Sequence, residues 1–541
     1  MNPAIYTSLP SSACTLGTVG SDGPDRITRS VYDAAGQVVT VQKAYGTALQ
    51  QDYASYTYSD NGKQTSMADA GGNKAAFAYN GHDLQVKWSF PSKTTPGTVS
   101  TTDYEEYGYD AGGNRTSLTR RDGRALGFSY DALNRVTVKT VPDGGCSGGH
   151  VCTTLTSAQS RDVYYGYDLT GAQTGARFDS ASGSDAVTSS YDGFGRQFSS
   201  TTSMGGVSRT LTYRWDANGN RSLIEYPDGN FVNYVSDGMD RFYYTTLNGA
   251  LPLFHTPYYP AGGAAAVYRW VGGYWNNFTQ VGYDDVGRMV WSITDVAGSG
   301  HDLDARFGYN PAGQIVSRSR DNDAYAYAGY TNASTSYTPN GPNQYAAVGA
   351  ASYTYDDSGN LTSDGTVTYG YDAENRLVSS SAGASLVYDP LGRLYQVASG
   401  STDTRFLYDG DRLTAEYDAS GNLLRRYVHG DGDDDPQVWY EGSGMSSPRY
   451  LYADHQDSIV AVTDSSGSVL NVNSYDEHGV PASGNAGRFQ YTGQAWIPEI
   501  GMYHYKARVY APKIGRFLQV DPIGYEDQVN LYAYVDAPMS E

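Results

Sequence analysis

The chain has little charge, few cysteines and no long apolar run. Only 18% of its 541 residues are charged, whereas 13% are aromatic, and this aromatic content excludes intrinsic disorder. No run of about eighteen apolar residues occurs, so we predict no membrane span. The first residues, MNPAIYTSLPSSACTLGT, lack a basic segment followed by an apolar one, so we predict no signal peptide.

Cysteine is too scarce for a fold held together by disulfides. The three cysteines are Cys14, Cys146 and Cys152. The last two lie in a Gly/Ser-rich insert, DGGCSGGHVC, and their spacing leaves two alternatives open. They either close a small loop in an oxidising compartment or stay as free thiols. The eight histidines show no metal-ligand spacing, and we expect no metal or cofactor.

Basic residues are scarce as well. The chain has 37 Lys and Arg against 58 Asp and Glu, which gives a net charge of −21 at pH 7. A chain of this charge is repelled by phosphate backbones and by anionic lipid surfaces. We therefore expect that neither nucleic acid nor an anionic membrane is its main partner.

Tyrosine and glycine, in contrast, are abundant, with 51 and 64 residues. Many of the tyrosines stand in a Tyr-Asp dipeptide that recurs roughly every 20 residues, and a period of this size indicates a repeat architecture. The dipeptide begins at Tyr32, Tyr109, Tyr130, Tyr167, Tyr191, Tyr283, Tyr355, Tyr371, Tyr388, Tyr408, Tyr417 and Tyr475.

One repeat, YGYDAGGNRTSL at 107–118, shows what a unit builds. Alternating aromatic and small residues predict a strand that ends at Tyr109. Asp110 can accept backbone N–H groups just downstream, and Gly113 or Asn114 can adopt the positive φ of a tight turn. A second strand then begins at Arg115, so the unit is predicted to be a β-hairpin.

Consecutive hairpins are expected to add edge to edge into one antiparallel sheet. A flat sheet of this length would twist and expose long edges, so we expect it to coil. The predicted fold is therefore all-β, a long sheet of repeated hairpins coiled into a spiral barrel or hollow shell. Each Tyr-Asp pair is interpreted as scaffold. Residues 242–275 lack the Asp-turn signature and are interpreted as diverged hairpins or a longer loop.

Beyond residue 426 the repeats give way to longer motifs in a fixed order. These are YVHGDGDDDPQVWY, YLYADHQDSIVAVTDSSGSV, YDEHGVP, RFQYTGQAW, GMYHYKARVYAPKIGRFLQVDPIG and NLYAYVDAP. With the repeats before them, they resemble the YD-repeat (Rhs) family and its Rhs-associated core. The resemblance implies a YD-repeat β-shell at 1–426 and a core domain at 427–541, which we expect to be incomplete at its C-terminal end.

The resemblance also implies a function. Members of this family wind their repeats into a hollow shell around a variable C-terminal polypeptide, often a toxin. A similar role here implies a non-catalytic, secreted or cell-surface scaffold whose export route is unknown. Its partners would be a C-terminal toxin cargo or N-terminal plug segments that are absent from this chain.

Family members release their cargo by self-cleavage that resembles aspartic-protease chemistry. Asp521, in VDPIG, corresponds to the first of the two aspartates, whereas the second Asp-Pro-x-Gly-Leu motif has no match. Asp536 stands too close to Asp521 to occupy it. Because this chemistry needs one protonated and one ionised carboxylate, we expect no self-cleavage.

A second hypothesis is a cell-surface carbohydrate-binding or adhesion module, in which Trp270, Trp275 and Trp439 stack on sugar faces.

Three weaker candidates have simpler interpretations. Ser147 fits Gly-x-Ser-x-Gly formally but lies in the Gly-rich insert, so a loop is favoured over a nucleophile. His455, between Asp454 and Asp457, is interpreted as structural rather than as a base or metal ligand. The last candidate is an acidic turn, for which exposure to solvent is favoured over Ca²⁺ binding; it contains Asp431, Asp433, Asp434 and Asp435.

Overall fold

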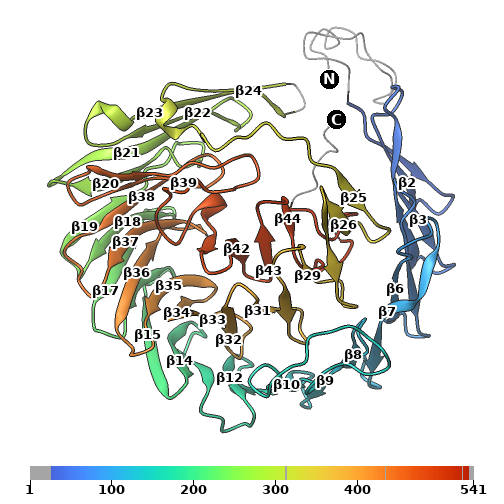
Figure 1. Cartoon of the computed structure of the whole chain (residues 1–541). Helices are drawn as coiled ribbons and strands as arrows, with labels where there is room; N and C mark the ends of the chain where they lie inside the picture. Colours follow the sequence, from blue (N-terminus) through green and yellow to red (C-terminus); the bar gives the residue numbers. More distant parts are fainter. Residues whose placement is uncertain (1–25, 311–312, 433, 527, 535–541) are drawn as a thin grey trace.

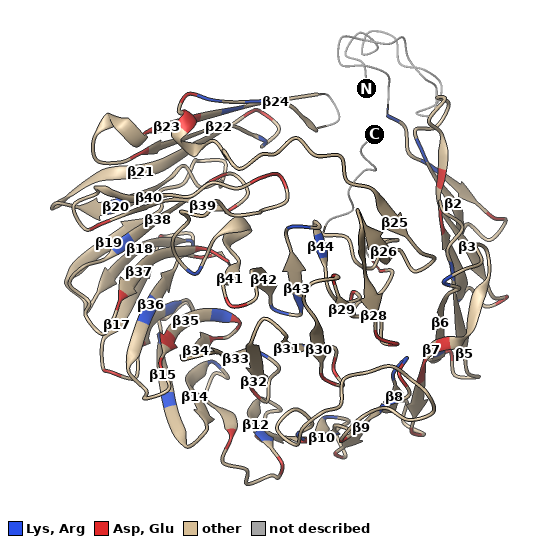
Figure 2. Cartoon of the chain, in the orientation of Figure 1, with Lys and Arg blue, Asp and Glu red and all other residues tan. Residues whose placement is uncertain are grey.

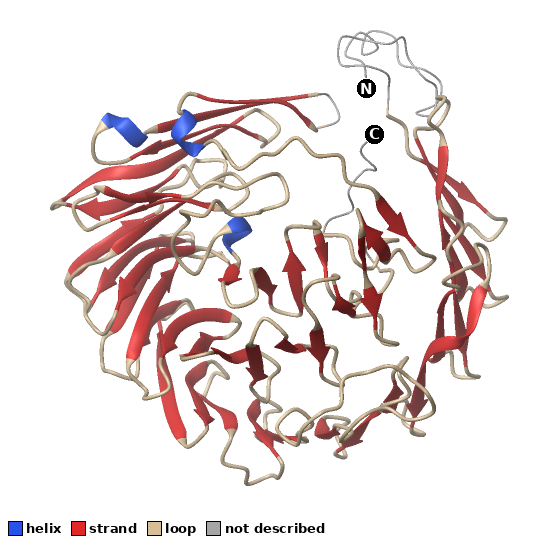
Figure 3. Ribbon diagram, in the orientation of Figure 1, coloured by secondary structure: helices blue, strands red, loops and turns tan. Residues whose placement is uncertain are grey.

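The protein is described by a computed structural model that covers residues 26–310, 313–432, 434–526 and 528–534. Nearly all of its regular structure is β-strand, and the strands wind as a spiral (Figures 1 and 3). The helical elements in these ranges are three short 3₁₀ turns, η2 (Ser299–His301), η3 (Asp323–Tyr325) and η4 (Tyr491–Gly493). Within the same ranges, no helix has the length and apolar character needed to cross a bilayer.

The outer turn of the spiral is a 24-stranded antiparallel sheet, here called the wall, in which each strand pairs with the next along the chain. Its strands are β1 (Arg29–Tyr32), β2 (Val38–Lys43), β3 (Gln51–Tyr58), β4 (Gln64–Asp69), β5 (Lys74–Tyr79), β6 (Gln85–Pro91), β7 (Val99–Tyr109), β8 (Arg115–Thr119), β9 (Ala125–Tyr130), β10 (Val136–Thr140), β11 (Val163–Tyr167), β12 (Gln173–Phe178), β13 (Ala186–Tyr191), β14 (Gln197–Met204), β15 (Val207–Trp215), β16 (Arg221–Glu225), β17 (Phe231–Ser236), β18 (Phe242–Leu247), β19 (Leu251–His255), β20 (Ala266–Val271), β21 (Tyr274–Tyr283), β22 (Met289–Asp295), β23 (Leu303–Tyr309) and β24 (Ile315–Arg320).

The chain then turns inside the wall, where it forms what we call the inner coil (Figure 1). Two small sheets come first, a three-stranded one and a two-stranded one. Their strands are β25 (Tyr337–Pro339), β26 (Tyr345–Val348) and β27 (Ala351–Ser352), and then β28 (Thr354–Tyr355) and β29 (Leu361–Ser363).

An 11-stranded sheet follows and lies along the inside of the wall. Its strands are β30 (Tyr369–Tyr371), β31 (Leu377–Ser380), β32 (Ala384–Tyr388), β33 (Leu394–Ser399), β34 (Thr402–Asp409), β35 (Arg412–Tyr417), β36 (Leu423–His429), β37 (Pro436–Glu441), β38 (Arg449–Ala453), β39 (Ile459–Thr463) and β40 (Val469–Val472). A last four-stranded sheet lies near the centre of the spiral, with β41 (Ala495–Ile497), β42 (Met502–Tyr505), β43 (Arg508–Ala511) and β44 (Arg516–Phe517).

Apolar cores join these layers from the outside inward. One core packs wall residues such as Leu211 and Phe254 against Tyr440 and Tyr452 of the 11-stranded sheet. A second core packs the opposite face of that sheet, including Tyr427, against the central sheet. The wall and the inner coil therefore stabilise each other by burying their facing surfaces.

The repeat unit is the hairpin that the sequence predicts. In the unit at 107–118, Oδ1 of Asp110 accepts the backbone N–H of Gly112 and of Asn114, both at 2.9 Å. Gly113 has φ of 85°, which a glycine adopts without strain. Gly108 pairs with Ser117 and Tyr109 with Arg115, so the register shifts at the turn end of the paired strands, which adds to the bend. The predicted fold class is confirmed.

The tyrosine of most units has a structural role that the sequence left open. Its hydroxyl donates to the backbone carbonyl of the first residue of the preceding strand, as Tyr109 does to Gln85 at 2.8 Å and Tyr388 to Leu377 at 2.9 Å. The bond ties neighbouring hairpins together at the turn end, where the backbone ladder is ending. The same bond is made by Tyr58, Tyr79, Tyr130, Tyr167, Tyr191, Tyr309, Tyr371 and Tyr408.

An arginine four residues after the aspartate often completes the unit. In the inner coil, Nε of Arg393 donates to Oδ2 of Asp389 at 2.8 Å, and the guanidinium lies 5.2 Å from the centre of the next repeat tyrosine, Tyr408. In the wall, Arg196 makes the same bond to Asp192. The Asp–Arg pair therefore fixes the turn and braces the neighbouring hairpin.

These two turns give a matched prediction, because one aspartate is buried and the other is partly exposed. Replacing Asp389 with alanine is expected to lower the free energy of unfolding by about 3 kcal/mol, since Asp389 is 1% exposed and its loss leaves the Arg393 guanidinium, whose side chain is 10% exposed, without its carboxylate. Asp192→Ala in the wall is expected to have a much smaller effect, because water solvates both partners. Urea denaturation of the two variants measures the difference, and equal losses would contradict it.

Two interpretations along the chain can be compared with the structure. Residues 242–275 hold strands β18 to β20 and the start of β21, so they are diverged hairpins, as one of the two alternatives stated. The boundary predicted between 1–426 and 427–541 falls within β36, in the middle of a continuous sheet. A division there would be one of sequence motif, because the sheet does not break.

Candidate functional site

The aspartate singled out by the sequence, Asp521, lies in the centre of the molecule and is 4% exposed. Its Oδ2 lies 2.8 Å from Nη2 of Arg508, which comes from β43. Its Oδ1 accepts the backbone N–H of Ile523 at 3.1 Å, and its own N–H donates to the carbonyl of Leu531 at 2.9 Å. Both carboxylate oxygens are therefore engaged, and the backbone on either side is fixed.

A cavity of about 70 Å³ adjoins Asp521 and is lined by wall, inner coil and C-terminal residues together. Two other carboxylates line it, and each has a cation of its own. Glu105, from the wall, lies 3.2 Å from Arg120. Glu374, from the inner coil, lies 2.5 Å from Nζ of Lys139. Burial alone would raise the pKa of Glu374, but the nearby cations lower it to about 2, so this carboxylate is ionised.

This geometry differs from an aspartic-protease site. Such a site holds two carboxylates that share one proton, so that one acts as acid and the other as base. Here Asp521 faces a guanidinium, and the other two carboxylates of the cavity are ion-paired. Asp536 lies outside the described residues. The contacts of Asp521 suit a structural carboxylate that anchors the C-terminal segment.

Two of the last described residues of the C-terminal segment are buried against the wall. Leu531 and Tyr532 are 4% and 2% exposed and pack with Trp88 and Phe90 of β6. The Tyr532 hydroxyl donates to the carbonyl of Gly359, in the turn between β28 and β29, at 2.6 Å. Gly359 has φ of 89°, and a Cβ there would lie 2.5 Å from Arg121 and 2.8 Å from Tyr532. Only glycine fits where these three parts of the chain meet.

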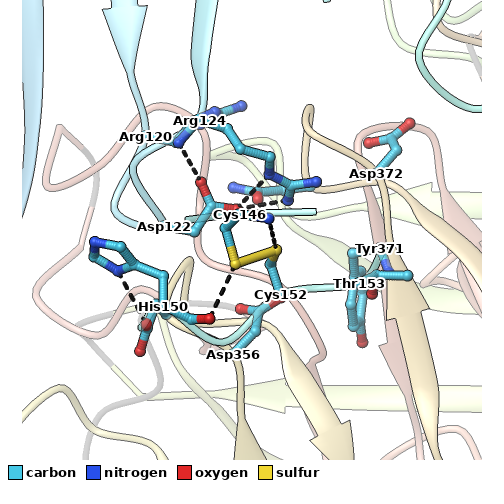
Figure 4. Close-up of polar contacts among 12 residues, drawn as sticks. Arg120, Asp122, Arg124, Cys146, His150, Cys152, Thr153, Asp356, Tyr371 and Asp372 are labelled. Carbon is cyan, nitrogen blue, oxygen red and sulfur yellow. Dashed lines mark hydrogen bonds and ion pairs between the residues drawn. A yellow bond between two sulfur atoms is a disulfide. The ribbon is translucent and has the colours of Figure 1, made fainter. Parts of the chain in front are cut away.

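The cysteine insert lies between β10 and β11. The sequence left open whether its two cysteines close a loop or stay as free thiols. Cys146 and Cys152 form a disulfide with Cα atoms 6.0 Å apart (Figure 4). Cys14 lies outside the described residues. Ser147 is exposed in the same loop, with neither a strand before it nor a helix after it, as the loop interpretation expected.

Of the three tryptophans proposed to stack on sugars, the prediction for Trp439 is wrong. Trp439 is 5% exposed and belongs to the core between the 11-stranded sheet and the central sheet. Packing against the central sheet covers it, and this packing could not be read from local sequence. Trp270 and Trp275 are partly buried neighbours in β20 and β21, with ring centres 4.9 Å apart, and His255 lies 4.5 Å from Trp275.

The acidic turn is less exposed to solvent than expected. Asp434 lies 2.9 Å from Nζ of Lys506 and accepts a bond from Gln494 at 2.8 Å. Burial raises the pKa of Asp435. Asp433 lies outside the described residues. Contacts with the C-terminal segment draw this turn inward.

His455 packs on the Phe307 ring at 4.5 Å, and burial lowers its pKa, in agreement with a structural role. Nowhere in the described ranges do three side chains of metal-binding type converge.

Sequence reasoning missed a fully buried ionic cluster at Glu416. Its carboxylate is 0% exposed, accepts Nε of Arg488 at 2.8 Å and the hydroxyl of Tyr427 at 2.6 Å, and lies 3.0 Å from Nη1 of Arg425. The cluster joins the 11-stranded sheet to the segment before the central sheet. A glutamate at an inward position of the strand LTAEY was the only local signal.

Comparison with known proteins shows the same architecture. The family model described as the teneurin YD-shell matches residues 277–537, and the RHS Repeat model matches residues 109–145. The fold is shared with a chain of the Photorhabdus luminescens Tc holotoxin pore, at a TM-score of 0.68 and 15% identity, over 95% of this chain and 30% of that one. A TcdB2–TccC3 complex gives a TM-score of 0.52 at 16% identity.

Two curated relatives are named for an activity on nucleic acids, and the second is also named a toxin. The tRNA nuclease WapA of Bacillus subtilis is 29% identical over 42% of this chain and 11% of its own length. Double-stranded DNA deaminase toxin A of Burkholderia cenocepacia is 22% identical over 96% of this chain and 45% of its own length. The chain thus spans about a tenth of the first and less than half of the second. The family models, the repeat chemistry and the shared shell fold show that the chain belongs to the YD-repeat (Rhs) family.

Proposed function

We propose that the chain is a non-catalytic scaffold that encloses or presents a polypeptide toxin continuing from its C-terminal end. The observation that carries the proposal is the burial of Leu531 and Tyr532 against the inner face of the wall. These residues lie inside the spiral, which supports enclosure of a polypeptide that follows them. The proposal keeps the division into a repeat shell at 1–426 and a core at 427–541.

Several features support the proposal. Two relatives are named for activities on nucleic acids, one of them as a toxin, and each is much longer than this chain. The disulfide favours an oxidising compartment, and hence a secreted or cell-surface protein. Along the ribbon in Figure 2, basic positions are interleaved with acidic ones, which suits a scaffold better than a nucleic-acid-binding surface.

Enclosure can be tested with an unstructured, lysine-rich extension joined after residue 541. Under brief trypsin treatment the extension is expected to be cut more slowly than the same peptide joined before residue 1. Equal cleavage at both ends would count against enclosure and leave only presentation. The two fusion proteins contain the same peptide, so its intrinsic susceptibility to trypsin cancels.

The absence of self-cleavage is tested at Asp521. The full-length chain is expected to keep its intact mass of 58.4 kDa on prolonged incubation, and Asp521→Asn is expected to behave identically. The structural role predicts a different effect, because the variant weakens the contact with Arg508 and lowers the midpoint of urea denaturation. A fragment formed by the natural chain and absent from the variant would contradict the proposal.

The aromatic pair Trp270 and Trp275 keeps a second candidate function open, carbohydrate binding or adhesion at a cell surface. The supporting observation is that both rings remain partly exposed beside His255 on neighbouring strands. A glycan array would show binding that is lost in the Trp270→Ala and Trp275→Ala variants. Lack of glycan binding by the natural chain would remove this candidate.

A further inference from the structure

The disulfide insert does more than close a small loop, because it is the point where the wall contacts the start of the inner coil. Residues 141–162 between β10 and β11 contain no regular secondary structure, whereas most other wall strands are joined by short turns. The insert leaves the edge of the wall and reaches residues more than 200 positions later in the chain. Figure 4 shows the disulfide between these two parts.

Two groups of contacts hold the insert to the inner coil. The backbone N–H of Val151 donates to Oδ2 of Asp357 at 2.8 Å, and the N–H of Asp357 donates to the carbonyl of Val151 at 2.9 Å. His150 adds a contact from its Nδ1 to the same carboxylate at 3.1 Å. Further along, the N–H of Tyr371 donates to Oγ1 of Thr153 at 2.8 Å.

All of these contacts come from residues inside the disulfide ring or next to it. His150 and Val151 lie between the two cysteines, and Thr153 follows Cys152. Within the ring, the N–H of Cys146 donates to Sγ of Cys152 at 2.9 Å, and the other disulfide sulfur lies in contact with the carbonyl of His150, at 3.1 Å. The disulfide therefore holds the contact groups in the geometry that meets the inner coil.

Apolar packing beneath the insert also joins it to the inner coil. Leu155 and Ala373, from the insert and the inner coil, share a small core with wall residues Leu118 and Leu126. A Cβ on Gly370 would lie 3.2 Å from the side chain of Thr153, so the two segments approach closely. Asp356, next to Asp357, is 1% exposed, and burial raises its pKa to about 6.

We propose that the Cys146–Cys152 disulfide is a redox-sensitive clasp that holds the first part of the inner coil, residues 353–381, to the wall. A thiol reductant opens it. A thiolate of the reductant attacks one sulfur, the S–S bond breaks, and a second thiolate releases the reductant as its own disulfide. The protein gains two thiols, whose protons come from the reductant. Both cysteines are partly exposed, so the reductant has access.

Opening the ring restores many conformations to residues 146–152, so the contact groups spend less time in the geometry that meets Asp357 and Tyr371. The inner coil then unfolds locally more often, while the rest of the wall keeps its own hairpins. The clasp does not depend on the proposed function, because it follows from contacts within this chain.

Hydrogen exchange of the full chain, with and without dithiothreitol, tests the clasp. Reduction is expected to speed backbone exchange roughly tenfold in residues 353–381 as well as in the insert, and to leave β15 to β18 unchanged. A Cys14→Ser variant is expected to keep this response, since its disulfide is intact. The Cys146→Ser, Cys152→Ser double variant is expected to exchange fast at both places and to ignore the reductant.

A second variant separates the clasp from a local effect of the disulfide. Asp357→Ala removes the carboxylate that Val151 and His150 contact. Residues 353–381 are therefore expected to exchange faster even when the disulfide is oxidised. Reduction should then add little. Faster exchange confined to the insert on reduction would overturn the proposal. So would a mass showing three free thiols, rather than one, in the protein purified without reductant.

Discussion

Replacing Glu416 with alanine is expected to lower the free energy of unfolding by about 3–5 kcal/mol at pH 7, because it leaves Arg488 buried without a carboxylate. The expected loss is large because both of these partners are buried: Glu416 is 0% exposed and Arg488 is 7% exposed. Urea denaturation measures it. The matched control is Glu441→Ala, since Glu441 pairs with Arg425 and Arg449 but is 43% exposed and should cost less than about 1 kcal/mol.

The same cluster gives a pH dependence with a defined sign. Burial alone would raise the pKa of Glu416, but Arg488 and its other partners lower it to about 2 in the folded chain. A carboxyl whose folded pKa is depressed contributes stability that is present above its unfolded pKa, near 4.3, and is lost as the pH falls toward 2. The Glu416→Ala variant should lose less stability over that range than the natural chain, and parallel pH curves would contradict the assignment.

Arg269→Ala is expected to be similarly costly, at about 3–5 kcal/mol, for a different reason. Arg269 is 2% exposed and reaches from β20 of the wall to β38, where Nη2 and Nε donate to the carbonyl of Leu451 at 2.6 and 3.2 Å. Its guanidinium also lies 3.8 Å from the centre of the Tyr452 ring. Truncation leaves a cavity and a buried carbonyl without a donor.

The control for Arg269 lies in the same wall. Arg306, in β23, pairs with Asp304 but is 51% exposed, so Arg306→Ala is expected to cost less than about 1 kcal/mol. Hydrogen exchange in β38 gives a second readout, because only Arg269→Ala should speed it. If both variants have the same midpoint of urea denaturation as the natural chain, Arg269 does not hold the wall to the inner coil.

The hairpin repeat could be predicted from sequence because its chemistry is local. Asp110 and Gly113 shape one turn within a few residues, and the same pattern returns along the chain, so the strand order followed directly. The path of the coil did not follow, because it depends on contacts such as Arg269 with Leu451 that join residues far apart. Period and turn chemistry say nothing about which hairpins face each other.

The candidate site was predictable only in part. The motif around Asp521 marked that residue but not its pairing with Arg508, earlier in the same motif, and the neighbouring Glu105 and Glu374 come from two other segments that only the fold brings together. Trp439 was misjudged for the same reason, since an aromatic residue in a strand looks alike whether solvent or a second sheet covers it. Glu416 was missed because a charged residue in a strand is usually exposed.

Limited proteolysis of the full chain tests most directly whether the repeats act together as one scaffold. If the wall and the inner coil stabilise each other, residues 26–534 should persist as a single large fragment. The Glu416→Ala and Arg269→Ala variants should shorten its lifetime. Rapid conversion of the natural chain into a ladder of fragments cut at successive Asp turns would show that the hairpins fold independently, and would contradict a continuous shell.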